Sequence, residues 1–323
     1  MTSQTMTSLP TATTPDTLSI TAVEQETGIA KDTLRVWEKR YGFPNPLRDS
    51  SQERLYPMEQ VERLKRIRLL LDMGYRPGKV AHLEDEELQK LIDRNTNLSK
   101  TKIKNNSSHE ELEALLRHIE THNTSTLRSA LQHALIRKGL APFVTQLVAP
   151  LTTAVGMAWA QSRFDVFEEH LYTEVITNVL RSCLSTLTTD AVMQPPRVLL
   201  TTIPQESHGL GLLMVQALLT VEGCDCISLG TQTPASDIVR AAAAHQVDIV
   251  ALSFTNLHNA STVQNTLRDL RKALPATTEI WAGGSCASLY LKPLEGITTQ
   301  QSLDRIAELV AQWRQTHQTG SAH

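Results

Sequence analysis

The sequence is short of the features that mark several protein classes. Its 323 residues contain only four cysteines and no C-x-x-C pair, which favours a protein of the reducing cytoplasm. No stretch reaches the roughly 18 uninterrupted apolar residues of a membrane helix, so no membrane contact is expected. The net charge of −3 is small and averages over unlike regions. With 41% apolar and 20% charged residues, the composition is typical of a globular protein.

Three distinct blocks follow a polar N-terminal segment. Residues 1–16 are rich in Thr and Ser and lack an apolar h-region, so they predict a disordered tail and not a signal peptide. The first block covers residues 17–83, the second 109–190 and the third 195–318. Residues 84–108 predict a linker, because the acidic run "EDEELQ" and the stretch "RNTNLSKTKIKNNSSH" are low in apolar residues.

The first block predicts two helices and a wing. The stretch "SITAVEQETGIAKDTLRVWEKRYG" indicates a short helix, a turn at Gly28 and a second helix, on which Leu34, Trp37 and Tyr41 form one buried stripe. Two helices joined by a glycine-containing turn are typical of a helix-turn-helix. The next stretch, "FPNPLRDSSQERLYP", favours a two-stranded wing, and Pro57 suits the first residue of the following helix.

The charge of this block supports nucleic-acid binding. Residues 17–83 contain twelve Lys and Arg against nine Asp and Glu, so the block carries +3 inside a chain of −3. A cationic face binds DNA by releasing counterions from the phosphates. A solvated charged helix would explain the charge alone, but the order helix, turn, helix, wing favours double-stranded DNA as the partner.

The stretches "AKDTLRVWEKRYGF" and "RLYPMEQVERLKRIRLLLDMGY" resemble the winged helix-turn-helix of the MerR family of transcription regulators over nearly the whole block. The resemblance implies that the second helix faces the major groove and that the wing touches the DNA backbone or minor groove. The implied DNA-binding residues are Lys31, Thr33, Arg35, Lys39 and Arg40 of the helix and Arg54 and Tyr56 of the wing. Metal-sensing members continue into a long dimerisation helix and a cysteine site, which this chain lacks, so metal sensing is not expected.

The second block predicts four helices with short joints, which is typical of a four-helix bundle, with a kink at Pro150 in the third helix. Trp159 lies in the last turn of that helix, and Glu169 and His170 lie in the first turns of the fourth. Because the turn "SRF" makes the two helices antiparallel, all three side chains are expected at one end of the bundle. Taken alone, the block favours a core Trp and a surface Glu–His pair near a helix N-terminus.

The third block alternates strands and helices, which predicts an open, flavodoxin-like (Rossmann-type) parallel sheet and makes the whole chain a multidomain protein. Strands are expected at "RVLLTTI", "CDCISLG", "VDIVALSF" and "EIWAGG", with a weak fifth near "EGITT". Ligands of such folds bind beyond the C-terminal strand ends. His208 follows the first strand, Ser253 and Thr255 end the third, and Gly283 and Gly284 end the fourth, so their loops are expected to converge.

A ligand site is expected where these loops meet. His208, with the carboxylate of Glu206 two residues before it, has the form of a metal ligand oriented by a hydrogen-bonded acid. The paired glycines let a bulky group lie against the backbone. A histidine that caps a helix is the alternative for these two residues by themselves.

The set Glu206-x-His208-x-x-Gly211, Ser253-x-Thr255 and Gly283-Gly284 resembles the cobalamin-binding signature, in which many members have Asp in place of Glu206. The resemblance implies that His208 is the lower axial ligand of cobalt. It also implies that the displaced dimethylbenzimidazole tail lies in a cleft beside the serine and the paired glycines.

The order of MerR-like head, helical bundle and cobalamin domain resembles the CarH/LitR family of photoreceptor repressors over essentially the whole chain. The resemblance implies adenosylcobalamin as cofactor, with Trp159, Glu169 and His170 on its upper face. It implies a homotetramer that binds operator DNA in the dark and releases it when light breaks the cobalt–carbon bond. Well-known members have a histidine directly after the Trp, which takes the upper cobalt position after photolysis, whereas this chain has Ala160.

Two other function classes stay open. One is a MerR-type regulator that senses cobalamin itself, or acts without it, and does not switch with light. The other is a corrinoid-carrying subunit of an enzyme, since methyltransferase and mutase modules share the bundle or the sheet. The DNA-binding head argues against the second class. No nucleophile or acid–base pair for turnover stands out, so the chain is predicted not to be an enzyme.

Overall fold

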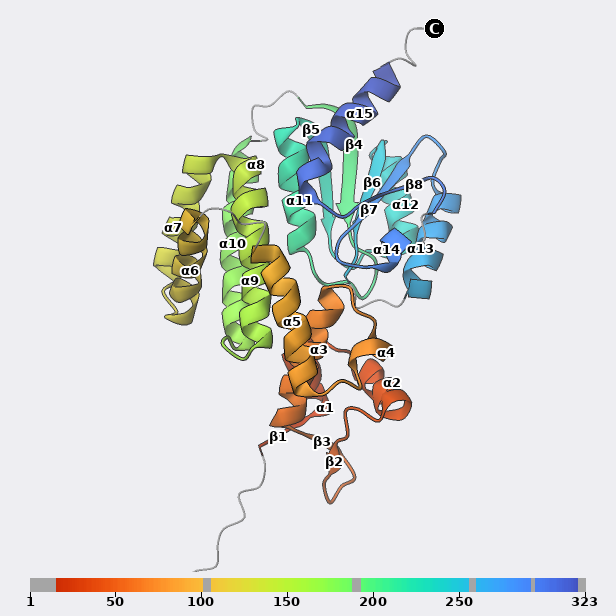
Figure 1. The fold of residues 1–323 in the computed structure, drawn as a ribbon. Coiled ribbons are helices and arrows are strands. Elements are labelled where there is room, and N and C mark those ends of the chain that lie inside the picture. The colour runs from red at the N-terminus through yellow and green to blue at the C-terminus, as the bar shows by residue number, and fades with distance from the viewer. Residues whose placement is uncertain (1–15, 101–105, 188–192, 256–259, 292–293, 319–323) are drawn as a thin grey trace, which may run out of the picture.

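The computed structural model describes residues 16–100, 106–187, 193–255, 260–291 and 294–318. Within these residues the chain forms a small N-terminal head, a layer of helices and a parallel sheet with helices on both faces (Figure 1). The tail predicted for residues 1–16 lies outside the described residues, apart from Asp16.

The head begins with β1 (Thr17–Ser19), α1 (Ile20–Thr27) and α2 (Lys31–Tyr41). Gly28 ends α1 with a φ of +64°, a conformation that glycine adopts without steric cost, so the chain can turn directly into α2. Leu34 and Trp37 are buried and Tyr41 is half-buried. The predicted helix–turn–helix order and the buried stripe on α2 are therefore present.

A small antiparallel sheet follows. β2 (Leu47–Arg48) and β3 (Arg54–Pro57) form a hairpin, and β1 pairs with the other edge of β3, so β3 is the central strand of three. Pro57 is the last residue of β3 and stands one residue before α3 (Met58–Asp72), so its prediction as the first helical residue is wrong by one position. α3 and the short α4 (Pro77–Val80) complete the expected block.

The linker predicted for residues 84–108 is wrong over its first part, because α5 (Asp85–Lys100) forms there and packs along α3. Leu88 and Ile92 of α5 are fully buried in the head core. The acidic residues that suggested a linker suit a helix N-terminus, where the helix dipole is positive. Asp85 also lies 4.0 Å from Arg63 and 3.6 Å from Arg66. Residues 101–105 lie outside the described residues.

The helical layer consists of α6 (Asn106–Glu120), α7 (Thr124–Lys138), the continuous run α8 (Leu140–Phe143), η1 (Val144–Val148) and α9 (Ala149–Ala160), and α10 (Val166–Leu187). α10 packs against α6, α7 and α9. A π-helical turn, η1, ends two residues before Pro150, with the Ala149 N–H bonded to the Val144 carbonyl. Because Pro150 has no N–H to donate, the regular ladder is interrupted at this point of the helix.

The run Leu140–Ala160 is the one helix among the described residues that is long and apolar enough to cross a membrane. Its side chains Phe143, Leu147, Leu151 and Val155 are buried in the core that the helical layer shares with the sheet. The length and the apolar composition of this helix therefore agree with a helix that packs in the core of the fold.

The sheet contains β4 (Gln194–Thr201), β5 (Cys224–Gly230), β6 (Ile249–Ser253), β7 (Glu279–Gly283) and β8 (Ile297–Gln300), all parallel, in the order β5-β4-β6-β7-β8. This is the predicted flavodoxin-like order, and the weak fifth strand is present. The flanking helices are α11 (Leu210–Val221), α12 (Ala235–Ala244), α13 (Ala260–Ala273) and α15 (Ile306–Gln318), with short α14 (Ser288–Leu291) and η2 (Leu303–Arg305) near the last strand.

Alternation along β6 shows how the sheet separates two cores. Ile249 and Ala251 pack into the core formed with α11, α15 and the helical layer, whereas Val250 and Leu252 pack into the core under α12 and α13. A strand buried on both faces must be apolar throughout, which accounts for the run "IVAL".

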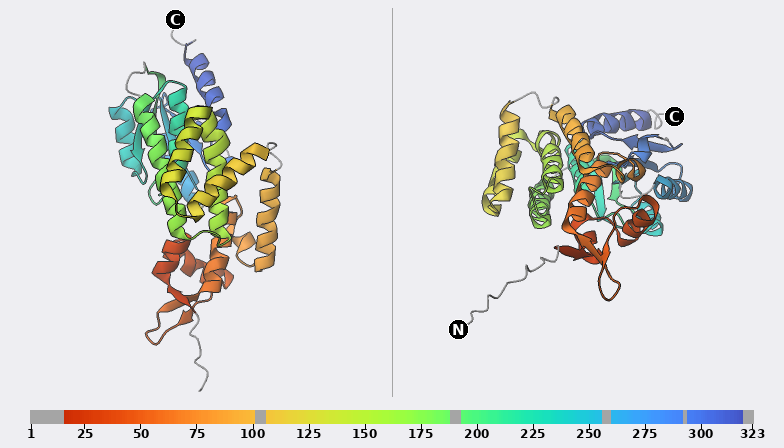
Figure 2. Two further views of the ribbon diagram at one scale, coloured as in Figure 1. Left: turned by 90° about the vertical axis from the view of Figure 1, so that its left-hand side faces the viewer. Right: turned by 60° about the horizontal axis from the view of Figure 1, so that its bottom comes forward.

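The head lies at the end of the molecule where α9 and the central strands of the sheet end (Figures 1 and 2). Ala160, the last residue of α9, is fully buried as a member of the head core. Trp159 packs against both the head core and the core of the helical layer. The end of α9 therefore lies where the head meets the core that the helical layer shares with the sheet.

Candidate functional site

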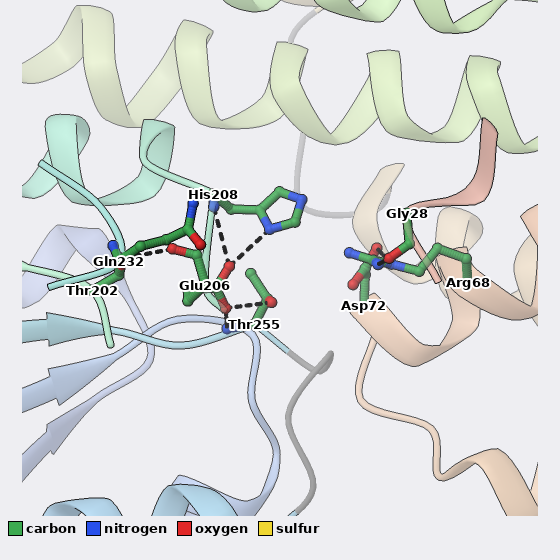
Figure 3. Close-up of polar contacts among 8 residues, drawn as sticks. All are labelled: Gly28, Arg68, Asp72, Thr202, Glu206, His208, Gln232 and Thr255. Carbon is green, nitrogen blue, oxygen red and sulfur yellow. Dashed lines mark hydrogen bonds and ion pairs between the residues drawn. The ribbon is translucent and has the colours of Figure 1, made fainter. Parts of the chain in front are cut away.

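The loop between β4 and α11 holds an imidazole and a carboxylate in a fixed arrangement (Figure 3). His208 Nδ1 lies 2.8 Å from Glu206 Oε1, and the His208 backbone N–H donates to the same oxygen over 3.1 Å. Because the carboxylate accepts the Nδ1 proton, the Nε2 nitrogen is left with its lone pair. The imidazole is 49% exposed and points away from the sheet, so Nε2 can bind an electron-pair acceptor.

Glu206 is fully buried, and its carboxylate is stabilised by hydrogen-bond donors from two loops. Its Oε2 accepts hydrogen bonds from the Thr255 N–H over 2.8 Å and from the Thr255 hydroxyl over 2.6 Å. With the two bonds from His208, four donors converge on one carboxylate, as a buried charge requires. The predicted convergence of the loops after β4 and β6 is thus confirmed for these three residues.

Thr202 fixes the conformation of the loop between β4 and α11, and this role was not identified from the sequence. Its hydroxyl donates to the Glu206 carbonyl over 2.6 Å and accepts from the Gln232 N–H over 2.8 Å. The loops after β4 and β5 are thereby tied together. A threonine at the end of an apolar strand was the available signal, but the same pattern is common where no ligand binds.

The paired glycines at the end of β7 leave no room for side chains. A Cβ on Gly284 would lie 2.2 Å from the Phe254 carbonyl oxygen, and one on Gly283 would lie 2.8 Å from the Gln300 carbonyl oxygen. Gly284 also has a φ of +113°. A Cβ on Gly211 would lie 3.7 Å from Ser253 Oγ, which is ordinary contact, so that glycine is not sterically required.

The Tyr290 hydroxyl holds the glycine loop in place. It donates to the Gly284 carbonyl over 2.7 Å and lies 3.2 Å from the Gln300 carbonyl, so it joins the loop after β7 to the end of β8. Burial raises the pKa of Tyr290 to about 12, so the hydroxyl keeps its proton at neutral pH. No sequence signal pointed to this tyrosine.

The residues expected on the upper face lie near the end of the helical layer. Glu169 accepts from the Thr173 hydroxyl over 2.8 Å, and His170, with 71% of its side chain exposed, lies 3.7 Å from Glu169. The buried carboxylate at this end is Glu168, which receives the Asp165 N–H over 2.7 Å and pairs with His122. The described contacts join Glu169 to His170 but do not bring either onto Trp159.

The helix of the expected DNA-binding face is accessible. Arg35, Lys39 and Arg40 are exposed, whereas Lys31 and Thr33 are half-buried. Lys31 Nζ lies 3.4 Å from Glu24, and Arg35 pairs with Asp32 over 2.9 Å. A row of cations therefore lines the solvent side of α2.

The expectation for Tyr56 is wrong. Its side chain is fully buried in the head core, and burial raises its pKa. Arg54 is held by Glu38 of α2 over 2.9 Å, so it fixes the wing against the helix. The exposed wing cation is Arg48, which sequence reasoning passed over although it stands beside the predicted turn.

Comparison with protein families assigns the parts of the chain. Residues 18–87 match the MerR HTH family regulatory protein model, residues 196–294 match a B12 binding domain, and residues 111–183 match a second B12 binding domain model. The glycine loops, His208 and Glu206 all fall within the first B12 match, and α6 to α10 hold the second.

Two curated relatives match almost end to end. The HTH-type transcriptional repressor CarH of Myxococcus xanthus is 26% identical over 90% of this chain and 98% of its own. The HTH-type transcriptional repressor CarA of the same organism is 29% identical over 93% and 97%. The chain is a CarH-like MerR and B12-binding regulator. Both relatives are repressors, which agrees with the prediction that it is not an enzyme.

The fold of this CarH-like chain also resembles a solved corrinoid protein. The Methanosarcina barkeri monomethylamine corrinoid protein matches 64% of this chain and 99% of its own, with a TM-score of 0.52 and 15% identity. At that identity the similarity concerns the fold alone. It supports the arrangement of the sheet and the helical layer without their head.

Proposed function

We propose that the chain is a light-responsive transcriptional repressor that binds adenosylcobalamin through His208, assembles on operator DNA as a homotetramer in the dark, and leaves the DNA in light. The observation that carries this proposal is the imidazole whose Nδ1 is fixed by buried Glu206 and whose Nε2 faces away from the sheet. Metal-binding histidines are held in this way by a carboxylate on the other ring nitrogen.

The residues present fit a corrinoid. The described residues contain no group of three or more His, Cys, Asp or Glu side chains that could hold a metal ion, so a single histidine suits a metal that its own macrocycle already holds. Gly283 and Gly284 would lie against the tail, beside Ser253. Trp159, Glu169 and His170 would cover the upper face. When bound, adenosylcobalamin supplies a cobalt–carbon bond that visible light breaks.

The head supplies the DNA-binding part of the proposal. Arg35, Lys39 and Arg40 of α2 would enter the major groove, and exposed Arg48 of the wing would meet a phosphate. Arg54 acts indirectly, by holding the wing on α2.

An absorbance spectrum of the protein with adenosylcobalamin, before and after green light, tests the cofactor assignment. We expect bound cofactor in the dark, a changed spectrum after light, and binding at least tenfold weaker in His208→Ala. His245→Ala, an exposed histidine at the end of α12, is the matched control. Unchanged affinity and spectrum in His208→Ala would remove the basis of the proposal.

Assembly and DNA binding are tested by size-exclusion chromatography and by titration of promoter DNA with dark and illuminated protein. We expect assembly only with adenosylcobalamin in the dark, and Trp159→Ala to uncouple assembly from light while cobalamin stays bound. Identical elution in both states, with photolysis verified, would contradict the light switch.

One observation favours a second candidate, a regulator that responds to cobalamin and not to light. Ala160 has no group that binds cobalt, and it is fully buried in the head core. For this candidate, adenosylcobalamin and hydroxocobalamin would promote assembly equally. The same chromatography separates the two functions.

A further inference from the structure

The head contacts both sides of the candidate cobalamin site. We call the end of α9 the helix side and the loop after β7 the sheet side. On the helix side, Ala160 is buried in the head core, and α3 packs on α9. On the sheet side, the turn after α3 reaches the loop that follows the paired glycines, where a Cβ on Gly74 would lie 3.7 Å from the Ala287 Cβ.

These two contacts come from one rigid body. α3 belongs to a single core with α1, α2 and α5, in which Leu64, Ile67 and Leu70 are fully buried. A closely packed core transmits displacement with little deformation. While both contacts are made, the head therefore holds the helix side and the sheet side at one fixed spacing.

A corrinoid between His208 and Trp159 would impose a spacing of its own. Trp159 is only half-buried, and it packs against both the head core and the core of the helical layer. An adenosyl group that packs on Trp159 would compete with the head for contact with this side chain. A ligand with different interactions in two arrangements shifts their populations, and the coupling is reciprocal.

We propose that the head clamps the site in the cofactor-free protein, and that binding of adenosylcobalamin releases the head from Ala287 and the end of α9. This inference rests on the proposed function, because it assumes the corrinoid. It adds that the DNA-binding head and the cofactor compete within one chain before any second copy is involved.

The buried guanidinium of Arg68 connects the clamp to the start of α2. Asp72, two residues before Gly74, accepts from Arg68 Nε over 2.9 Å, and Arg68 Nη1 donates to the Gly28 carbonyl over 3.3 Å (Figure 3). Arg68 is 5% exposed. The turn that touches Ala287 is thus bonded to the turn that starts α2, so the two turns move together with the head.

An engineered disulfide between Gly74→Cys and Ala287→Cys tests the clamp, because the 3.7 Å between the two β-carbon positions matches disulfide geometry. Both changes are made with Cys286→Ala, since that native thiol neighbours the new one. We expect the oxidised variant to bind adenosylcobalamin roughly tenfold more weakly than the same protein reduced, within the range usual for coupled sites. Hydroxocobalamin, with its small upper ligand, should show a smaller difference.

The reverse measurement uses the same protein. Saturating adenosylcobalamin should lower the equilibrium constant for disulfide formation in a glutathione redox buffer by the same factor, as reciprocity of the two equilibria requires. Each single cysteine variant, under the same oxidant, controls for other pairings and for the effect of replacing Gly74.

Two results would overturn the clamp: equal affinity of the oxidised and reduced protein with the disulfide verified by mass spectrometry, or failure of the disulfide to form in the cofactor-free protein. Absence of cobalamin binding in the wild type and in the reduced variant would instead reject the proposed function, and the clamp with it.

Discussion

Replacement of Glu206 by Gln tests the negative charge of the buried side chain, because glutamine has nearly the same shape as glutamate. The carboxylate accepts four hydrogen bonds, two from His208 and two from Thr255. A glutamine keeps one oxygen, and its amide group then faces two donors. Two hydrogen bonds to a charged acceptor are worth about 1.5–3 kcal/mol each. Relief of the buried charge offsets part of that loss, and we expect a net destabilisation of roughly 2 kcal/mol.

The effect on the cofactor follows from the proton position. If the amide oxygen faces Thr255, the amide N–H₂ faces His208, and Nδ1 can then only accept. Nε2 would carry the proton and lose the lone pair that binds cobalt. If the oxygen faces His208, the amide N–H₂ faces Thr255, and the loop after β6 loses the two hydrogen bonds that Thr255 donates. Loss of such supporting groups typically weakens metal binding about 10–100-fold, or ~1.4–2.7 kcal/mol.

The assay is spectroscopic titration of adenosylcobalamin in the dark, together with thermal unfolding of the cofactor-free protein. Thr255→Val is the matched control, because it removes one hydroxyl donor but keeps the carboxylate and the Nδ1 proton. It should lower stability by about 1 kcal/mol and change affinity little. Wild-type affinity in Glu206→Gln would refute the reasoning about the tautomer.

Three further outcomes are expected. Gly284→Ala should cost roughly 3 kcal/mol or more in a urea unfolding curve, because its Cβ would meet the Phe254 carbonyl oxygen at 2.2 Å; a loss below that of Gly211→Ala would contradict the steric argument. Arg48→Ala should lower the slope of log affinity for DNA against log salt by about 0.9, and an unchanged slope would show that Arg48 meets no phosphate. Burial raises the pKa of Cys226 to about 12, so its neutral thiol stabilises the fold below the ordinary thiol pKa, and this contribution is lost as pH rises toward 12. The urea midpoint should fall above about pH 9, and Cys226→Ala should flatten that fall.

The sheet and its ligand-binding edge could be predicted from sequence because their signals are local and dense. Apolar runs such as that of β6 have few alternatives to a buried strand, and the short loops fix the parallel order. The Glu206–His208 pair was predictable because both residues stand in one loop. Thr202 and Tyr290 were not, because each is a single hydroxyl that bonds to backbone groups, and such contacts leave no pattern of side chains in the sequence.

Two errors in the head concern side chains that are buried by elements distant in the sequence. Tyr56 was expected on the DNA side, together with Arg54, because the resemblance to the MerR family places both residues in the wing. The resemblance does not show which side of the wing each residue faces, and Tyr56, which stands opposite Leu18 in the pairing of β3 with β1, is fully buried in the head core. The helix α5 was missed because its acidic first turn outweighed the apolar pair Leu88 and Ile92, whose burial depends on α3.

The bond network of Tyr290 links the site to the most easily lost strand of the sheet. β8 has four residues and pairs on one side only, so it is the strand expected to open first in local unfolding. Gly283 pairs with Gln300 in that strand, and the Tyr290 hydroxyl joins both loop and strand. Local unfolding of β8 would therefore disorder the glycine loop while the central strands of the sheet stay folded. The rate of amide hydrogen exchange in this loop should match that of β8 and not that of β6. The affinity for a ligand whose tail lies on the glycine loop would then depend on the stability of β8.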